Sequence, residues 1–353
     1  MTTKGPSERR AYLHKGVGET VGVVTLDGRP ERLMVEWPGD DSLNAEGVRG
    51  VARVRKIEKA FASAFVQLPG GADLLLPLRL DMPSLIEGGL VEIEVKTPSR
   101  ADKAGVARFM AEGQGEPRIV AQAPTIEERL RHAVKAGSPT TGDKALLAVE
   151  AAEADVLATI FSLPGGGDIA VEPTRALTAI DVDLGAREGG DSKRAARLAN
   201  MAAINVAARV LRLKGLAGIV VFDLVGRGHD AQALTTAARN AFAPDNPGVG
   251  IGAISKFGTL EMIVPRRSPP ILERMIGAQG EPNPRYVARR LARALEREGR
   301  ANPGGRLRAR CAPGAAQAFL AELDEGVAER LGRRFTVEAD SAWPADRIEV
   351  HAE

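Results

Sequence analysis

Three residue classes are scarce in this sequence, and each shortage excludes a kind of protein or site. The single cysteine, Cys311, permits no internal disulfide and no thiolate cluster for zinc, so a reducing cytoplasm is the expected location. No apolar run reaches the roughly 20 residues that span a bilayer, and the polar segment MTTKGPSERRAYLHKG lacks the apolar core of a signal peptide. Aromatic residues make up only 4% of the chain, so nucleic-acid binding would depend on a few stacked rings.

The bulk composition is that of a folded protein with several domains. Hydrophobic residues (44%) and charged residues (27%) are near the globular average, and 353 residues favour two to four domains. The net charge of +2 is too small to indicate a nucleic-acid partner by itself, so local charge matters more.

The first part of the chain predicts β structure followed by helix. Residues 18–37 form two β-rich runs around Asp27-Gly28, which predicts a hairpin. Residues 48–96 contain short β-branched runs separated by Gly/Pro turns, which predicts a small β-barrel. Residues 100–155 are predicted to be rich in helix, because Thr125 is an N-cap residue ahead of an acidic first turn.

The second part predicts a β-α-β unit and a small α/β module. A Pro-Gly-Gly-Gly turn predicts a hairpin over 158–171; no Lys-Ser/Thr and no helix follow it, so a phosphate-binding loop is not expected. The β-α-β unit is expected as a strand near 175–185, a helix over 192–214 and a strand near 215–226, followed by a helix over 230–243 and a β-rich segment over 251–264. A Pro-rich break then indicates a domain boundary near 268–284. The small α/β module after it is expected to contain helices over 285–298 and 315–331 and strands at 306–311 and 334–339.

Two aspartates, Asp181 and Asp223, close the two strands of the β-α-β unit. If these strands are parallel neighbours, both carboxylates lie at one edge of the sheet, and Asp183 points to the same side as Asp181. Repulsion among such acids is relieved by a hard divalent cation, and magnesium binds carboxylates together with water and phosphate oxygens. The alternative for each acid alone is a turn or N-cap residue, and Asp183 before Leu-Gly suits that role.

Basic residues lie near these acids in the sequence. Lys193, Arg194 and Arg197 follow the first strand and could contact a backbone phosphate, or they could form a solvated helix face. Residues 266–310 contain twelve arginines, no lysine and four glutamates, which indicates either a polyanion-binding surface or a compositional bias. In the barrel segment, basic residues precede Phe61 and Phe65; either ring could stack on a base, although core packing is the alternative for Phe65.

Taken in order, these segments resemble the bacterial ribonuclease E/G family across most of the chain. The motifs that carry the resemblance are ALTAIDVD at 176–183, GGD at 189–191, Asn200, LRLKGLAGIVVFD at 211–223 and SKFGTLEM at 255–262.

The resemblance implies an α+β multi-domain fold. It comprises an RNase H-like fold interrupted by an OB-fold RNA-binding barrel, then a deoxyribonuclease I-like catalytic subdomain and a small α/β C-terminal domain. The corresponding boundaries are 1–46 and 100–156 for the two RNase H-like parts, 47–99 for the barrel, 157–270 for the catalytic subdomain, 271–284 for a linker and 285–353 for the C-terminal domain.

The resemblance also implies residue roles. Asp181 and Asp223 correspond to the family's metal-binding aspartates for Mg²⁺, with Mn²⁺ as a substitute. Asp183 stands where the family usually has asparagine and is expected to be the third catalytic residue, assisting directly or through a water molecule. Contacts to RNA are expected from the remaining motif and basic positions: Phe65, Lys96, Lys103, Lys193, Arg194, Arg197, Asn200 and Lys256.

Three departures from the family alter the expected function. Leu75 replaces a frequent stacking phenylalanine, the segment for the 5′-monophosphate sensor is largely missing, and the cysteines of the zinc link are absent, so neither zinc nor a zinc-bridged dimer is expected. The sequence predicts a magnesium-dependent endoribonuclease that cleaves single-stranded RNA to 5′-phosphate and 3′-hydroxyl ends. The alternatives are an RNA-binding protein of the same fold with weak or lost cleavage, or another metal-dependent phosphodiesterase.

Overall fold

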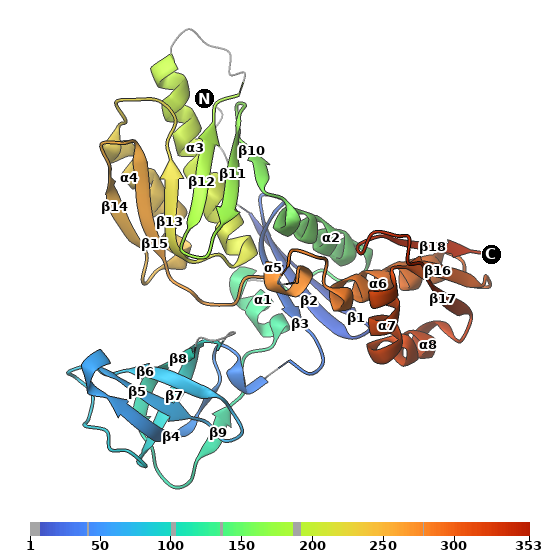
Figure 1. Ribbon diagram of the computed structural model, residues 1–353, viewed down its shortest axis with the longest axis horizontal. Helices are drawn as coiled ribbons and strands as arrows, with labels where there is room; N and C mark the ends of the chain where they lie inside the picture. The colour runs from blue at the N-terminus through green and yellow to red at the C-terminus, as the bar shows by residue number, and fades with distance from the viewer. Residues whose placement is uncertain (1–7, 41, 100–103, 135–136, 186–191, 278) are drawn as a thin grey trace. The chain divides into compact units, whose positions relative to one another are not determined.

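The computed structural model describes residues 8–40, 42–99, 104–134, 137–185, 192–277 and 279–353 (Figure 1). Internal contacts divide the chain into two compact units. Unit 1 comprises Met1–Asp40, Arg129–Leu157 and Pro270–Glu353, and unit 2 comprises Asp41–Glu128 and Ala158–Pro269. Each unit is described by itself.

Unit 1 combines two three-stranded sheets with helices. Strands β1 (Arg9–Gly16), β2 (Glu19–Leu26) and β3 (Arg29–Glu36) form an antiparallel meander, which confirms the predicted hairpin over 18–37. The second sheet has the order β17-β16-β18, of which β18 was not predicted. The remaining elements of this unit are α2 (Asp143–Leu157), α5 (Leu272–Met275), α6 (Pro284–Ala301), β16 (Leu307–Cys311), α7 (Pro313–Glu322), α8 (Asp324–Leu331), β17 (Phe335–Ala339) and β18 (Ile348–Ala352).

A buried ionic network joins the three segments of unit 1. The guanidinium of Arg293 in α6 pairs with Glu153 in α2 at 2.6 Å and with Glu19 in β2 at 2.7 Å, and all three residues are buried. Although burial alone would raise the pKa of the Glu19 carboxyl, Arg293 and His14 outweigh it and hold that pKa below its usual value. Removing one partner of such a buried pair leaves an uncompensated charge, which costs about 3–5 kcal/mol.

The arginine-rich segment 266–310 does not form an unoccupied cationic surface. Eight of its twelve arginines form ion pairs with carboxylates: Arg274, Arg285, Arg289, Arg293, Arg297, Arg300, Arg308 and Arg310. Most of these arginines therefore pair with carboxylates of unit 1, and the segment does not present the cationic surface that was considered for binding a polyanion.

The first part of unit 2 is a closed β-barrel. Its strands are β4 (Arg49–Glu58), β5 (Ser63–Gln67), β6 (Asp73–Pro77), β7 (Leu90–Thr97), β8 (Gly105–Glu112) and β9 (Arg118–Ala121), with short 3-10 helices at Ser42–Asn44 and Lys59–Phe61. The sheet order is β5-β6-β8-β7-β4-β9, and an additional β5–β4 pairing closes five strands into a barrel compatible with an OB-fold. Alternate residues face a core that includes Val54, Val66, Leu76 and Ile93.

The barrel extends further along the chain than predicted. Residues 100–155 were expected to be rich in helix, but β8 and β9 occupy part of that stretch, pairing with β6 and β7 and with β4 respectively. Within residues 100–155, helix forms at α1 (Ile126–Val134) and at α2. At α1 the expected cap is present as a capping box, in which the Thr125 hydroxyl accepts from the Glu128 amide and the Glu128 carboxylate accepts from the Thr125 amide.

The second part of unit 2 is a six-stranded sheet with helices on one face. Its strands run in the order β10-β11-β12-β13-β15-β14, and only β12 and β13 are parallel. The elements are β10 (Ile160–Ser162), β11 (Asp168–Pro173), β12 (Thr178–Asp183), α3 (Ser192–Lys214), β13 (Gly218–Asp223), α4 (Ala231–Ala241), a 3-10 helix at Ala243–Asp245, β14 (Gly250–Ile254) and β15 (Thr259–Val264). The predicted hairpin over 158–171 and the β-α-β unit are both confirmed.

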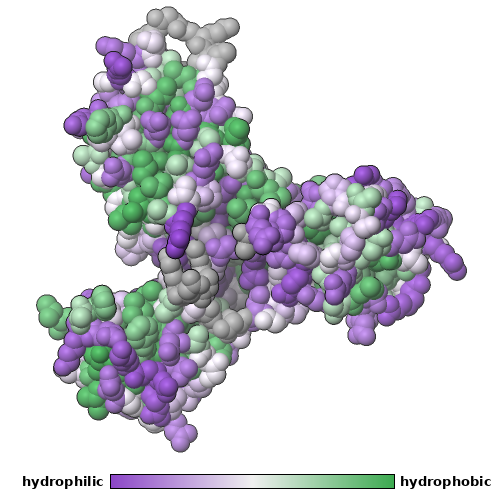
Figure 2. All heavy atoms as spheres, viewed as in Figure 1, coloured by the Kyte–Doolittle hydropathy of each residue, from purple (hydrophilic) through white to green (hydrophobic). Residues whose placement is uncertain are grey.

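Alternation along these strands separates the two faces of the sheet. Ile180, Val182, Val220 and Phe222 are buried together with apolar residues of α3 and α4, which lie behind the sheet in Figure 1. The opposite face is open, and in Figure 2 it carries both hydrophobic and hydrophilic side chains. This open face holds the predicted aspartates.

Candidate active site

Asp181 and Asp223 are direct partners in the register of the two parallel strands. Neighbouring strands lie about 4.8 Å apart, and side chains at partnered positions project from the same face of a sheet. Both residues are exposed, and the residues before them, Ile180 and Phe222, are buried on the other face. The chain therefore folds so that two carboxylates project from one open surface of the sheet.

Asp183 lies two positions beyond Asp181, on the same face, opposite Asp168 of β11. Its carboxylate accepts a hydrogen bond from the Gly185 amide, which is the turn role considered for it from the sequence. Within the described ranges, no group of three or more His, Cys, Asp or Glu side chains is close enough to hold a metal ion. Because magnesium keeps several waters and binds through one or two protein carboxylates plus phosphate oxygens, the Asp181–Asp223 pair fits its donor requirement.

A glycine-rich turn supports the end of β12. The predicted turn over 164–167 has three glycines at positive φ. At Gly167 a Cβ would lie 2.2 Å from the carbonyl oxygen of Asp183, so only glycine allows the hairpin backbone to approach this closely. The turn therefore both reverses the chain and fixes the backbone that carries Asp183.

Asn200 does not occupy the position expected of an RNA-contacting residue. Its side chain is only 1% exposed, and its amide group donates to the carbonyl of Val225 at 3.0 Å while its side-chain oxygen accepts from the Val225 amide at 3.1 Å. Val225 follows Asp223 by two residues, so Asn200 fixes the segment that leaves the carboxyl end of β13. Its helical spacing from the apolar Ala196 and Ala203 was the signal in the sequence for this burial.

The predicted cations of α3 differ in their surroundings. Lys193 and Arg194 are exposed in the first turn of the helix. Arg197 pairs with Asp230 at 3.2 Å, and the Asp230 carboxylate also caps α4 by accepting from the Ala233 amide. Part of the charge of Arg197 is therefore used to hold α3 and α4 together.

Lys256 lies in the turn between β14 and β15, three residues before the start of β15. Thr259, at the start of β15, is the register partner of Asp223, and the Gly258 carbonyl accepts from the Leu224 amide at 3.1 Å. The neighbouring Phe257, which the sequence reasoning did not single out, is 81% exposed. The signal available for it was its place between Lys256 and Gly258 in a short turn.

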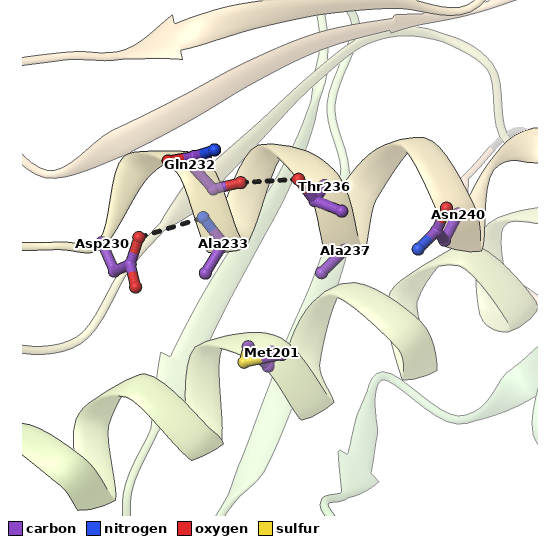
Figure 3. A pocket seen from close by; sticks show the side chains of 7 residues that line it. All are labelled: Met201, Asp230, Gln232, Ala233, Thr236, Ala237 and Asn240. Atoms are coloured by element: carbon purple, nitrogen blue, oxygen red, sulfur yellow. Dashed lines mark hydrogen bonds between the residues drawn. The ribbon is translucent and has the colours of Figure 1, made fainter.

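A shallow hollow of about 370 Å³ lies on the helical side of this subdomain (Figure 3). It is lined by Met201 of α3 and by Asp230, Gln232, Ala233, Thr236, Ala237 and Asn240 at α4. Since α3 and α4 cover the face opposite Asp181 and Asp223, this hollow is separate from the aspartate pair.

The barrel residues form a second predicted group. Phe65 in β5 is partly buried. Across the neighbouring strands its register partner is Leu75 in β6, which is paired with Val106 in β8, which in turn is paired with Thr97 in β7. Lys96 directly precedes Thr97 in the sequence, so it lies beside the far end of the row of partners that begins at Phe65. The Lys96 ammonium pairs with Glu94 at 3.1 Å. Lys103 and the GGD motif at 189–191 lie outside the described residues.

Part of the chain, including the sheet of unit 2, is similar to proteins of a known family. Residues 116–267 match the Ribonuclease E/G family. Ribonuclease E of Haemophilus influenzae is 39% identical over 114 residues, which are 31% of this chain and 12% of that protein. Ribonuclease E of Escherichia coli is 39% identical over 114 residues (31% and 11%), and that of a Nostoc species is 33% identical over 129 residues (35% and 19%).

The matched segment thus spans about one eighth of the length of the first of these relatives. No helix in the part of the chain that the structure describes is long and apolar enough to cross a membrane.

Proposed function

We propose that this chain, a member of the ribonuclease E/G family through its residues 116–267, is a magnesium-dependent endoribonuclease that cleaves single-stranded RNA in processing or decay. The observation that carries the proposal is the partnering of Asp181 with Asp223 on an open sheet face within the matched segment. The expected products carry 5′-phosphate and 3′-hydroxyl ends.

The carboxylates of Asp181 and Asp223 would hold Mg²⁺, which supplies an activated water and neutralises charge on the phosphate. The Asn200 side chain holds the backbone beyond Asp223, and the turn at Gly167 holds the backbone at Asp183. The two carboxylates are thereby positioned before substrate binds, so that little reorganisation is needed at the moment of reaction.

Cationic side chains near the pair would position the RNA backbone. Lys193, Arg194 and Lys256 are candidates for phosphate contacts, which supply affinity without reading sequence. In the barrel, Phe65 and Lys96 would contact the same strand of RNA. The complete architecture that we propose has an RNase H-like fold interrupted by the OB-fold barrel, with the sheet of unit 2 as the deoxyribonuclease I-like catalytic subdomain.

The decisive experiment compares three substitutions on the open face of one sheet. Asp181→Asn and Asp223→Asn remove the proposed ligands, while Glu261→Gln removes an exposed carboxylate on the same face of β15. Cleavage of an unstructured RNA is measured with magnesium and with a chelator. We expect the two aspartate variants to lose on the order of 100-fold or more in kcat/KM, since a catalytic metal stabilises the transition state by several kcal/mol.

The Glu261→Gln variant is expected to retain wild-type cleavage. Equal cleavage by all four proteins would refute the metal site and point to a contaminating nuclease. In the same assay, substrates with 5′-monophosphate and 5′-hydroxyl ends should be cleaved equally, because most of the sensor segment is missing; a strong preference for the monophosphate would contradict this part.

A second function is favoured by Asp183, an acid where the related family usually has asparagine. An extra negative charge beside the scissile phosphate disfavours the transition state, and the chain would then bind RNA without cleaving it. Tight RNA binding by the wild type with no magnesium-dependent cleavage would select this alternative. Restored cleavage in an Asp183→Asn variant would identify the cause.

A further inference from the structure

The turn between β14 and β15 presents an aromatic ring to solvent. Phe257 is 81% exposed, which makes it one of the most exposed large apolar side chains among the described residues. The Lys256 ammonium lies 5.0 Å from the centroid of this ring. A ring with a cation on it is a surface that can accept a flat π system and an adjacent negative charge.

Hydrogen bonds make this turn an ordered support for the ring. The Ser255 hydroxyl oxygen accepts from the backbone amides of Phe257 and Thr259, both at 3.2 Å, and lies 2.8 Å from the Thr259 hydroxyl. The Ser255 and Gly258 amides donate to the Thr259 and Ser255 carbonyls at 2.9 and 3.1 Å. Gly258 has φ +91°, which closes the turn directly after the ring.

The support is tied to the aspartate pair. The Leu224 amide donates to the Gly258 carbonyl, and Thr259 is the register partner of Asp223. The backbone of the turn is therefore bonded to the residue that follows Asp223. The backbone that carries the ring therefore has a defined position relative to the strand that carries Asp223, so stacking on the ring would order a substrate with little loss of backbone entropy.

We propose that Phe257 is a stacking platform for one nucleobase of single-stranded RNA next to the scissile phosphate, and that Lys256 contacts the adjoining phosphate. This inference rests on the proposed ribonuclease function and adds a base-binding position to the catalytic subdomain itself. A single isolated ring between Lys256 and Gly258 suits one base, whereas a protein partner requires a contiguous apolar patch. Because every base has a π face, the platform requires a base at this position without specifying which.

The test is an abasic scan of an unstructured RNA with one cleavage site. In each substrate a single nucleotide near the scissile bond lacks its base, and kcat/KM is measured for the wild type, Phe257→Ala and Phe257→Trp. The control variant is Leu320→Ala, which removes an exposed apolar side chain (61%) from α7, away from the proposed RNA-binding residues. The exposure of Phe257 means that its replacement should leave the melting temperature unchanged.

We expect the wild type to lose on the order of 10-fold in kcat/KM at one abasic position next to the cleaved bond, in line with the energy of stacking one base. Phe257→Ala should show the same loss on the intact RNA and no further loss at that abasic position. Phe257→Trp and Leu320→Ala should keep the dependence on that base. If Phe257→Ala keeps the wild-type dependence, or changes only the oligomeric state, the inference is overturned.

A binding measurement separates this inference from the proposed cleavage. Fluorescence of the Phe257→Trp variant, corrected for the natural Trp37 and Trp343, should be quenched by unstructured RNA and not by an abasic sugar-phosphate chain. Quenching without any cleavage would support the base platform and reject the nuclease function. Cleavage without base-dependent quenching would support the nuclease and reject the platform.

Discussion

Replacing Asn200 with alanine tests whether a buried amide positions the end of the strand that carries Asp223. The wild-type side chain makes two hydrogen bonds, at 3.0 and 3.1 Å, to the carbonyl and amide of Val225. Alanine makes neither bond and leaves both backbone groups unpaired. Leaving a buried donor or acceptor without a partner costs about 1–3 kcal/mol, and Val225 is only partly buried, so the loss of unfolding free energy should be about 2–4 kcal/mol.

The same helix provides a matched control. Asn205 is exposed, and its side chain makes one bond, to the Met201 carbonyl one turn earlier. Asn205→Ala removes that exposed bond and improves helix propensity, so its effect should remain within about 0.5 kcal/mol. The difference between the two variants isolates the contribution of the bonds to Val225.

Two measurements check this prediction. Denaturant unfolding gives the loss of stability, and hydrogen exchange over residues 218–226 reports local opening at the end of β13. We expect faster exchange in this segment only for Asn200→Ala, together with weaker magnesium-dependent cleavage. If the two asparagine variants unfold at the same denaturant concentration and exchange equally, Asn200 does not position this segment.

Two further predictions concern the support of the two units. Gly167→Ala should destabilise unit 2 and reduce cleavage, because the added Cβ would meet the Asp183 carbonyl oxygen. The control is Gly28→Ala, which has a similar positive φ but no atom within 4 Å of the added Cβ, so it should incur only backbone strain of about 1–3 kcal/mol. Equal melting temperatures for the two variants would contradict the close approach at Gly167. Because the pKa of Glu19 is lowered by Arg293 and His14, its contribution to stability is present above the unfolded pKa of about 4.3 and is lost as pH falls through the lower folded value. Acid titration of unfolding free energy should therefore be steeper below about pH 4.3 for the wild type than for Glu19→Gln, and parallel acid limbs would refute the assignment.

The predictable parts of the fold are those with strong local signals. The apolar run before Asp181, the long alanine-rich helix and the apolar run before Asp223 fixed the β-α-β unit, and parallel pairing then placed the two acids together. The strand at Arg118–Ala121 was missed because it has only four residues and its partner, β4, lies far away in the sequence. The strand at Gly105–Glu112 pairs with the preceding β7, but its alanine, methionine and glutamate residues are helix formers, so barrel pairing rather than local propensity determines it. The spacing of Asn200 from Ala196 indicated a buried face of the helix, but no local signal identifies Val225 as the backbone that it binds.

The ion pairs of Arg293 also have a consequence for the order of events during synthesis. Glu19 precedes its cationic partner by 274 residues, and Glu153 precedes it by 140. At roughly 5–20 residues per second, a ribosome adds those 274 residues in about 14 to 55 s. Over that interval the first hairpin carries an acid whose partner has not been made, while the whole of unit 2 is completed before Arg293 emerges. The unit that contains the start of the chain is therefore the last to complete its fold, and its strands are available to chaperones for most of translation.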